Sequence, residues 1–165
     1  MDKTIGLKFK SIYPFICIPN LQNMALKLLK GVWFLSMVVA LGVLLYVYAS
    51  LPQAVIIQEA SEGPVSVSNE TFFYTVMALM AITNVLVYVV GKVFKTNIAL
   101  RTWFHGLVTT LNIFFIVGLN FIALFNSNER YDYQRLSFVI YGSVALMVLC
   151  ACVWPVYLLF RRSKS

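Results

Sequence analysis

The chain has 165 residues, of which 61% are hydrophobic and only 12% are charged, and its formal net charge is +7 at pH 7. A soluble domain carries roughly 25% charged residues, so this composition excludes an ordinary soluble protein and indicates an integral membrane protein. The positive balance does not indicate nucleic-acid binding, because no soluble domain remains to carry a basic surface.

The first 30 residues form a separate segment in this prediction. Pro14 and Pro19 interrupt any long helix there, and the apolar run around them is too short to cross a bilayer. Aromatic side chains and lysines flank that run, which is typical of a segment lying in the membrane interface. We therefore expect residues 1–30 to lie under the inner leaflet, with a flexible tail as the alternative.

Four long stretches without charged residues follow this segment. A helix needs about 20 apolar residues to cross a hydrocarbon core of about 30 Å. The predicted transmembrane helices cover residues 31–50, 71–91, 102–125 and 136–160, and a basic tail covers 161–165. Short connections join neighbouring helices, so the sequence predicts an all-α membrane protein, an antiparallel four-helix bundle.

The connection between the first two helices has a strand-like pattern. Val55 and Ile57 lie at every second position of one run, and Val65 and Val67 lie at every second position of another. The turn-forming sequence Ser61-Glu62-Gly63-Pro64 separates the two runs. This pattern predicts a short β-hairpin. Because these valines and the isoleucine are too apolar for a free loop, we expect them to contact either the 126–135 loop or a partner protein.

The distribution of basic residues predicts the orientation. Eleven of the 13 lysines and arginines lie on the side that holds the N-terminus, the 92–101 loop and the C-terminus, and only Arg130 and Arg135 lie on the other. The positive-inside rule assigns the richer side to the cytoplasm. We therefore expect a multi-pass protein of the bacterial inner (plasma) membrane, with both termini cytoplasmic and the hairpin extracytoplasmic.

Polar residues form a stripe on two of the predicted helices. On the third helix the stripe comprises His105, Thr109, Asn112 and Asn120, and on the second it comprises Asn84 and Tyr88. Amides in hydrocarbon cost free energy unless they are hydrogen-bonded. The stripes therefore predict either hydrogen bonds that hold the two helices together or a polar cavity for a small ligand between them.

The sequence offers little for catalysis. No acid or base falls in the middle of a predicted span, and His105 is the single histidine. Cys150 and Cys152 would point in different directions on a helix, and Cys17 lies in the predicted cytoplasmic segment, so neither a disulfide nor a metal site is expected. We expect a protein that is not an enzyme and that has no catalytic residues, metal or cofactor.

One stretch resembles a known family. Tyr48-Ala49-Ser50-Leu51-Pro52, followed by Val55, Gly63 and Thr71-Phe72-Phe73, is similar to the N-terminal membrane module of SdpI-type bacterial immunity proteins. The resemblance covers about residues 44–90 and departs from the family in the loop, which lacks the His-x-Asn region. It implies a helix that ends at Leu-Pro, a short extracytoplasmic segment and a second helix, and an immunity or signalling role.

Three functions remain open from the sequence. The leading hypothesis is an accessory, anchoring or assembly subunit of a larger inner-membrane complex, which contacts lipids and other membrane subunits or self-associates. The second is a small oligomeric transporter or channel that uses the polar stripe. The third is the immunity or signalling role that the resemblance implies.

Overall fold

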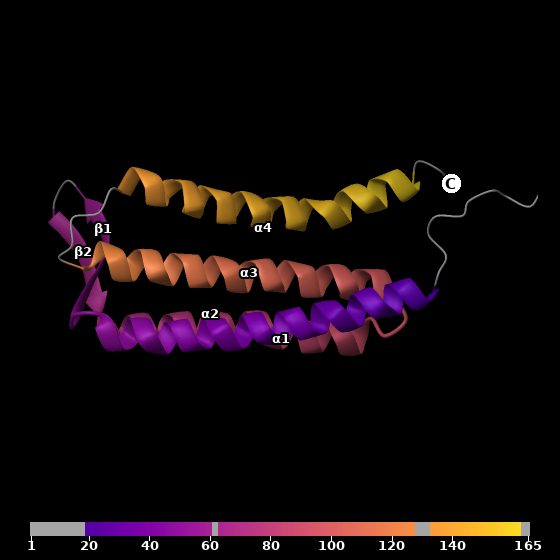
Figure 1. Ribbon diagram of the computed structural model, residues 1–165, viewed down its shortest axis with the longest axis horizontal. Coiled ribbons are helices and arrows are strands. Elements are labelled where there is room, and N and C mark those ends of the chain that lie inside the picture. Colours follow the sequence, from indigo (N-terminus) through magenta and orange to yellow (C-terminus); the bar gives the residue numbers. More distant parts are fainter. Residues whose placement is uncertain (1–18, 61–62, 128–132, 163–165) are drawn as a thin grey trace, which may run out of the picture.

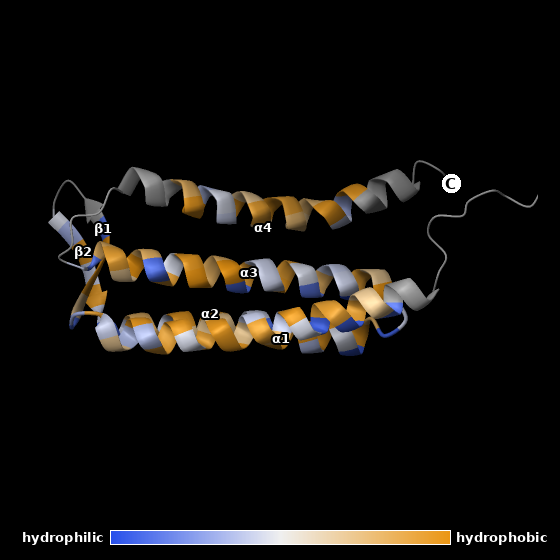
Figure 2. Ribbon diagram, in the orientation of Figure 1, coloured by the Kyte–Doolittle hydropathy of each residue, from blue (hydrophilic) through white to orange (hydrophobic). Residues whose placement is uncertain are grey.

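The computed structural model describes residues 19–60, 63–127 and 133–162, and it is mostly helical. The four helices and two strands, in chain order, are α1 (Pro19–Ser50), β1 (Ala54–Ala60), β2 (Gly63–Ser68), α2 (Asn69–Val93), α3 (Ile98–Phe125) and α4 (Tyr133–Arg162) (Figure 1). Each helix is long and apolar enough to cross a membrane, so the prediction of four such helices is confirmed. Apolar residues run along most of the length of each helix (Figure 2).

The first helix corrects one predicted boundary. α1 begins at Pro19 instead of residue 31, because proline is tolerated in the first turn, where its missing N–H has no intrahelical partner. The last twelve or so residues of the predicted interfacial segment are therefore helical. Residues 1–18 of that segment, with Cys17, lie outside the described residues.

The other helices extend the predicted spans by a few residues. α2 begins at an N-cap, Ser68, whose hydroxyl accepts a hydrogen bond from the Thr71 N–H at 3.2 Å. α3 begins in the same way, because the side chain of Asn97 accepts from the Leu100 N–H at 3.0 Å. Such side chains satisfy N–H groups that the first helical turn leaves unpaired. α4 continues through Pro155 as far as Arg162.

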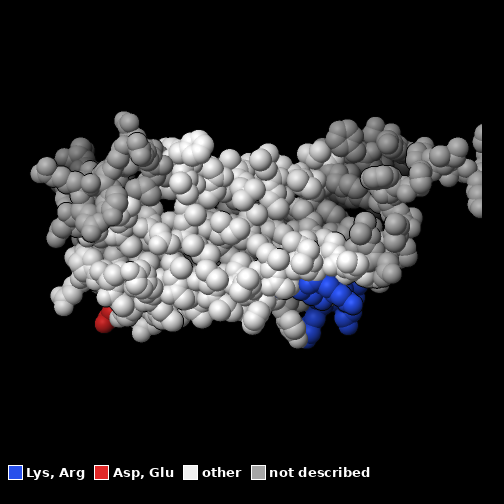
Figure 3. Space-filling model, viewed as in Figure 1, with Lys and Arg blue, Asp and Glu red and all other residues white. Residues whose placement is uncertain are grey.

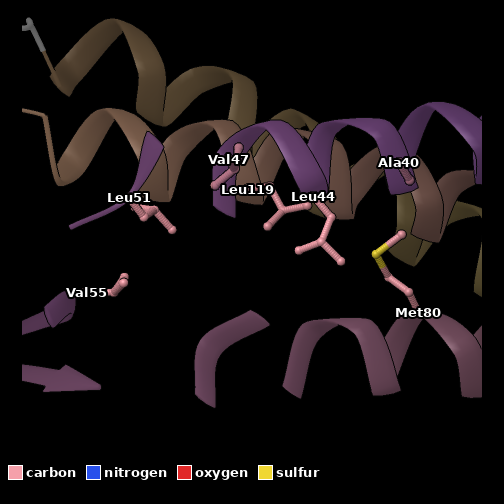
Figure 4. Packing of buried hydrophobic residues seen from close by; sticks show 7 residues of the cluster. All are labelled: Ala40, Leu44, Val47, Leu51, Val55, Met80 and Leu119. Carbon is pink, nitrogen blue, oxygen red and sulfur yellow. The ribbon is translucent and has the colours of Figure 1, made fainter. Parts of the chain in front are cut away.

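The helices do not share contacts equally. α3 contacts each of the other three, whereas α4, in the described part of the chain, contacts no helix except α3. The apolar core lies between α1, α2, α3 and β1, and seven buried residues form it: Ala40, Leu44, Val47, Leu51, Val55, Met80 and Leu119 (Figure 4). The molecule is therefore a three-helix core with a peripheral fourth helix.

A two-stranded antiparallel sheet lies at one end of the helices (Figure 1). Val55 pairs with Val67, and an irregularity in the register falls between Ile56 and Gln58. Gly63, at the start of β2, has a φ of +123°, which favours glycine. The turn residues 61–62 lie outside the described residues.

The four apolar hairpin residues divide into two pairs. Val55 is fully buried in the core and Val67 packs against it, so these two attach the sheet to the helices. Ile57 is 45% exposed and Val65 is 48% exposed. Asn126, the first residue of the 126–135 loop, hydrogen-bonds to the backbone N–H and C=O of Ile56, and residues 128–132 of that loop lie outside the described residues.

Candidate functional site

Two asparagines form the centre of the polar site. Asn84 of α2 donates from Nδ2 to Asn112 Oδ1 at 3.1 Å, and Asn112 of α3 donates from Nδ2 to Asn84 Oδ1 at 3.2 Å. Asn112 is completely buried and Asn84 is 9% exposed. This reciprocal amide pair joins two membrane-spanning helices in the interior of the bundle, where a lone amide would be costly.

α1 completes this network with two further side chains. Trp33 Nε1 donates to Asn84 Oδ1 at 2.9 Å, and Asn112 Nδ2 donates to Ser36 Oγ at 3.0 Å. The Ser36 hydroxyl in turn donates to the Trp33 carbonyl, and Asn84 Nδ2 also donates to the Met80 carbonyl at 2.9 Å. Every amide nitrogen and oxygen of the two asparagines therefore has a partner. We call these four residues (Trp33, Ser36, Asn84 and Asn112) the amide network.

The stripe residues on α3 do not all enter the network. The Thr109 hydroxyl donates to the His105 carbonyl of its own helix, and Asn120 donates to the Ile116 carbonyl of its own helix. Asn120 is exposed, so it does not bridge helices. The stripe predicted a helix contact at Asn84 and Asn112, and the structure places them together; Asn120 lies apart from that contact.

His105 contacts one member of the network, Trp33. Its ring meets the Trp33 ring edge-on, with centroids 5.7 Å apart, and its Nδ1 is 2.7 Å from the Arg101 carbonyl. The side chain is buried. Among the described residues no group of three histidine, cysteine or acidic side chains could hold a metal ion.

A cavity of about 390 Å³ opens beside Trp33 and His105. Three basic residues line it, Lys30 from α1, Lys92 from α2 and Arg101 from α3. Tyr88, the remaining stripe residue, also lines the cavity and is 64% exposed, so it belongs to this opening rather than to the helix contact. We call this opening the basic cavity.

The basic cavity lies at the end of the bundle opposite the hairpin. In Figure 3 the described basic side chains gather at one end of the visible face, and acidic atoms appear at the other. Lys92 lies one residue from the end of α2, and Arg101 lies in the first turn of α3. The cavity therefore lies where α2 ends and α3 begins.

α4 is attached to α3 through an aromatic contact. The rings of Trp103 and Trp154 stack with centroids 5.6 Å apart, and Trp103 Nε1 donates to the Cys150 carbonyl at 2.7 Å. Nearer the hairpin, a second cavity lies between the two helices and includes Ile116, Asn120 and Ile140 in its lining. α4 therefore packs against α3, and among the described residues it makes no hydrogen bond to the amide network.

Sequence reasoning missed the part of α1 in this site. Trp33 and Ser36 lie three residues apart, which places them on one face of a helix, and Ala40, buried, lies one turn further on. A serine and a tryptophan that share a helix face with a small residue could have indicated that this face of α1 packs against another helix. Asn126 was also missed, because its role depends on where the first strand lies.

The helices and the amide network together define the class, a multi-pass helical membrane protein with a hydrogen-bonded three-helix core. The chain matches no protein-family model, and no curated protein or solved structure is significantly similar to it.

Proposed function

We propose that this protein is a non-enzymatic accessory or assembly subunit of a larger complex in a bacterial inner membrane. The observation that carries the proposal is the hairpin. Its β1 strand is turned toward α3 and its edge is bound by Asn126, whereas no described segment forms backbone hydrogen bonds to the outer edge of β2. A partner strand can add to such an edge.

Exposed apolar side chains on the same sheet support this role. Ile57 and Val65 are each nearly half exposed, although the hairpin lies beyond the helix ends, where water rather than lipid would meet them. Proteins usually cover exposed sheet edges. A partner that pairs with β2 would bury that edge and Val65, and one that also covers the face of the sheet would bury Ile57 on β1.

The amide network favours an accessory subunit over a transporter, because its amide groups are fully hydrogen-bonded. A transporter that used the Asn84–Asn112 stripe would expose amide groups to a solute or to water. Here each amide group of that pair is already hydrogen-bonded within the bundle. The transporter hypothesis therefore ranks second, and the immunity or signalling role, which rests on the resemblance of residues 44–90, ranks third.

The proposed orientation has both termini in the cytoplasm. Its support is that Lys27 and Lys30 of α1, Lys92 and Lys95 around the end of α2, and Arg101 at the start of α3 lie away from the hairpin, because basic residues are retained on the cytoplasmic side. In this orientation the free edge of β2 faces the extracytoplasmic space, and its partner would be the outer domain of another membrane subunit.

The test is co-purification from native membranes. The Ile57→Ser/Val65→Ser variant should reach the membrane in normal amount, because both side chains are exposed, but a stoichiometric partner should be lost. The matched control is Gln53→Ser/Gln58→Ser, which changes two exposed residues of the same segment without removing apolar surface. Retention of the same partner by the Ile57/Val65 variant would show that the contact lies elsewhere, and a wild-type protein without any stoichiometric partner would contradict the proposal.

A further inference from the structure

We propose that the basic cavity binds the phosphate group of an anionic glycerophospholipid in the leaflet at the basic end of the bundle. The site shares Trp33 with the amide network and is separate from the hairpin edge. Its components are three cationic side chains from three different helices, two aromatic walls and an opening at headgroup depth.

The charge in the cavity lacks a counterion in the described structure. Lys30, Lys92 and Arg101 contribute three positive charges to one opening. The acidic residues that the structure describes, Glu59 and Glu70, belong to β1 and to the first turn of α2, at the opposite end of the bundle. Like charges gathered in this way repel one another, and a bound anion would relieve that repulsion.

Arg101 has an N–H group without a hydrogen-bond acceptor. Its Nη1 donates to the Lys95 carbonyl at 3.3 Å, but its Nε is buried and has no hydrogen-bond partner within the described residues. A guanidinium presents its donors in a planar fork that matches the oxygens of a phosphate. Arg101 lines the cavity, so a small rotation of its side chain would bring this donor to an oxygen bound there.

The walls of the cavity suit a lipid rather than a free anion. Trp33, Tyr88 and Val87 line it together with the cations, and Lys92 Nζ lies 4.7 Å from the centre of the Tyr88 ring. Tyr88 is 64% exposed on the outside of α2, where acyl chains would run along the helix. The cavity volume of about 390 Å³ falls within the range of about 300–1,000 Å³ found for small-molecule sites.

Location adds a second argument for lipid. Basic pockets between transmembrane helices on the cytoplasmic side are suited to anionic headgroups, which are concentrated in that leaflet. Lys92 lies next to the last residue of α2, and Arg101 follows the start of α3 by three residues, a distance of about 5 Å along the helix axis. A headgroup phosphate at the membrane surface would reach both.

The experiment uses the full chain in detergent micelles, with bound lipid counted by native mass spectrometry. Wild type should bind phosphatidylglycerol saturably and more tightly than phosphatidylcholine, whose headgroup has no net charge. The Lys30→Gln/Lys92→Gln variant should bind phosphatidylglycerol about tenfold more weakly, as expected for the loss of contacts to a charged group. Lys30 and Lys92 are exposed and their removal relieves like-charge repulsion, so without lipid the variant should unfold at a temperature no lower than that of wild type.

The matched control is Lys27→Gln/Lys95→Gln. It removes the same charge from exposed positions on the same end of the molecule, but neither lysine lines the cavity. Its affinity for phosphatidylglycerol should stay within about twofold of wild type, since exposed charges away from the site are screened by salt. An equal loss in both double variants would show general surface attraction and would overturn the proposal.

Two other outcomes would also overturn it. If wild type shows no preference for phosphatidylglycerol over phosphatidylcholine, the cavity does not select an anionic headgroup. If inorganic phosphate at the same concentration raises the unfolding temperature as much as the lipid does, and does so in wild type but not in Lys30→Gln/Lys92→Gln, the occupant is a soluble phosphate and not a lipid.

Discussion

Replacement of Asn112 by leucine tests whether the amide network holds the core together. Asn112 is completely buried, and the change removes three hydrogen bonds between helices, two to Asn84 and one to Ser36. Hydrogen bonds between membrane helices average about 0.6 kcal/mol, so the free energy of unfolding should fall by about 2 kcal/mol. The measurement is unfolding of the purified protein in mixed micelles, followed by circular dichroism.

The partners of Asn112 limit this loss. After the change, Asn84 Nδ2 still donates to the Met80 carbonyl, and Asn84 Oδ1 still accepts from Trp33 Nε1. One N–H of Asn84 Nδ2, which donated to Asn112 Oδ1, is left without its acceptor. Asn84→Leu leaves two donors unpaired, the Trp33 indole N–H and one N–H of Asn112 Nδ2, and a further unpaired buried donor adds about 1–3 kcal/mol. Asn84→Leu should therefore lower the free energy of unfolding more than Asn112→Leu does.

Asn120→Leu is the matched control on the same helix. Asn120 is exposed and hydrogen-bonds to a carbonyl of its own helix, so its replacement should leave the free energy of unfolding unchanged or slightly raise it. If Asn112→Leu and Asn120→Leu have the same effect within about 0.5 kcal/mol, about the size of one such interhelical hydrogen bond, the network does not stabilise the core and the reasoning fails.

Three further outcomes are expected. Asn126→Ala should speed amide hydrogen exchange at Ile56, because it removes the side-chain oxygen that accepts from this N–H at 2.7 Å; unchanged exchange would mean that the hairpin is held by its apolar contacts alone. Trp103→Phe should broaden the distribution of spin-label distances between α3 and α4, because it removes the hydrogen bond from the indole N–H to α4, and a distribution as narrow as in wild type would contradict this. A cysteine at Ser66 should react with a membrane-impermeant thiol reagent in intact cells and one at Thr96 only after lysis, and the reverse pattern would invert the proposed orientation.

Composition and charge spacing were enough to predict the four spans, because a helix without a polar face can be solvated only by lipid. Periodicity also placed Asn84 and Asn112 on facing stripes. It could not distinguish Asn112 from Asn120, since both lie on the same side of an ideal helix, and the choice depends on where α1 crosses α3. The start of α1 at Pro19 was missed because a proline can begin a helix as well as end one.

The basic cavity could not be predicted as a unit. Lys30, Lys92 and Arg101 each contributed to the orientation argument as separate charges near helix ends. Their convergence requires that α1, α2 and α3 meet at one level, which depends on side-chain packing between helices far apart in sequence. The same limit applied to Asn126, whose partner Ile56 lies 70 residues earlier in the chain.

The arrangement of contacts around α3 has a consequence for how the chain is assembled as it is synthesised. α1 and α2 make few contacts with each other, and the bond between Ser36 and Asn112 joins residues 76 positions apart. Before the third helix is present, the direct polar links between the described residues of the first two helices are Trp33 with Asn84 and Asn69 with the Tyr48 carbonyl, so most contacts of the core form only with α3. α4, which touches α3 alone among the described helices, can then join a unit that is already folded.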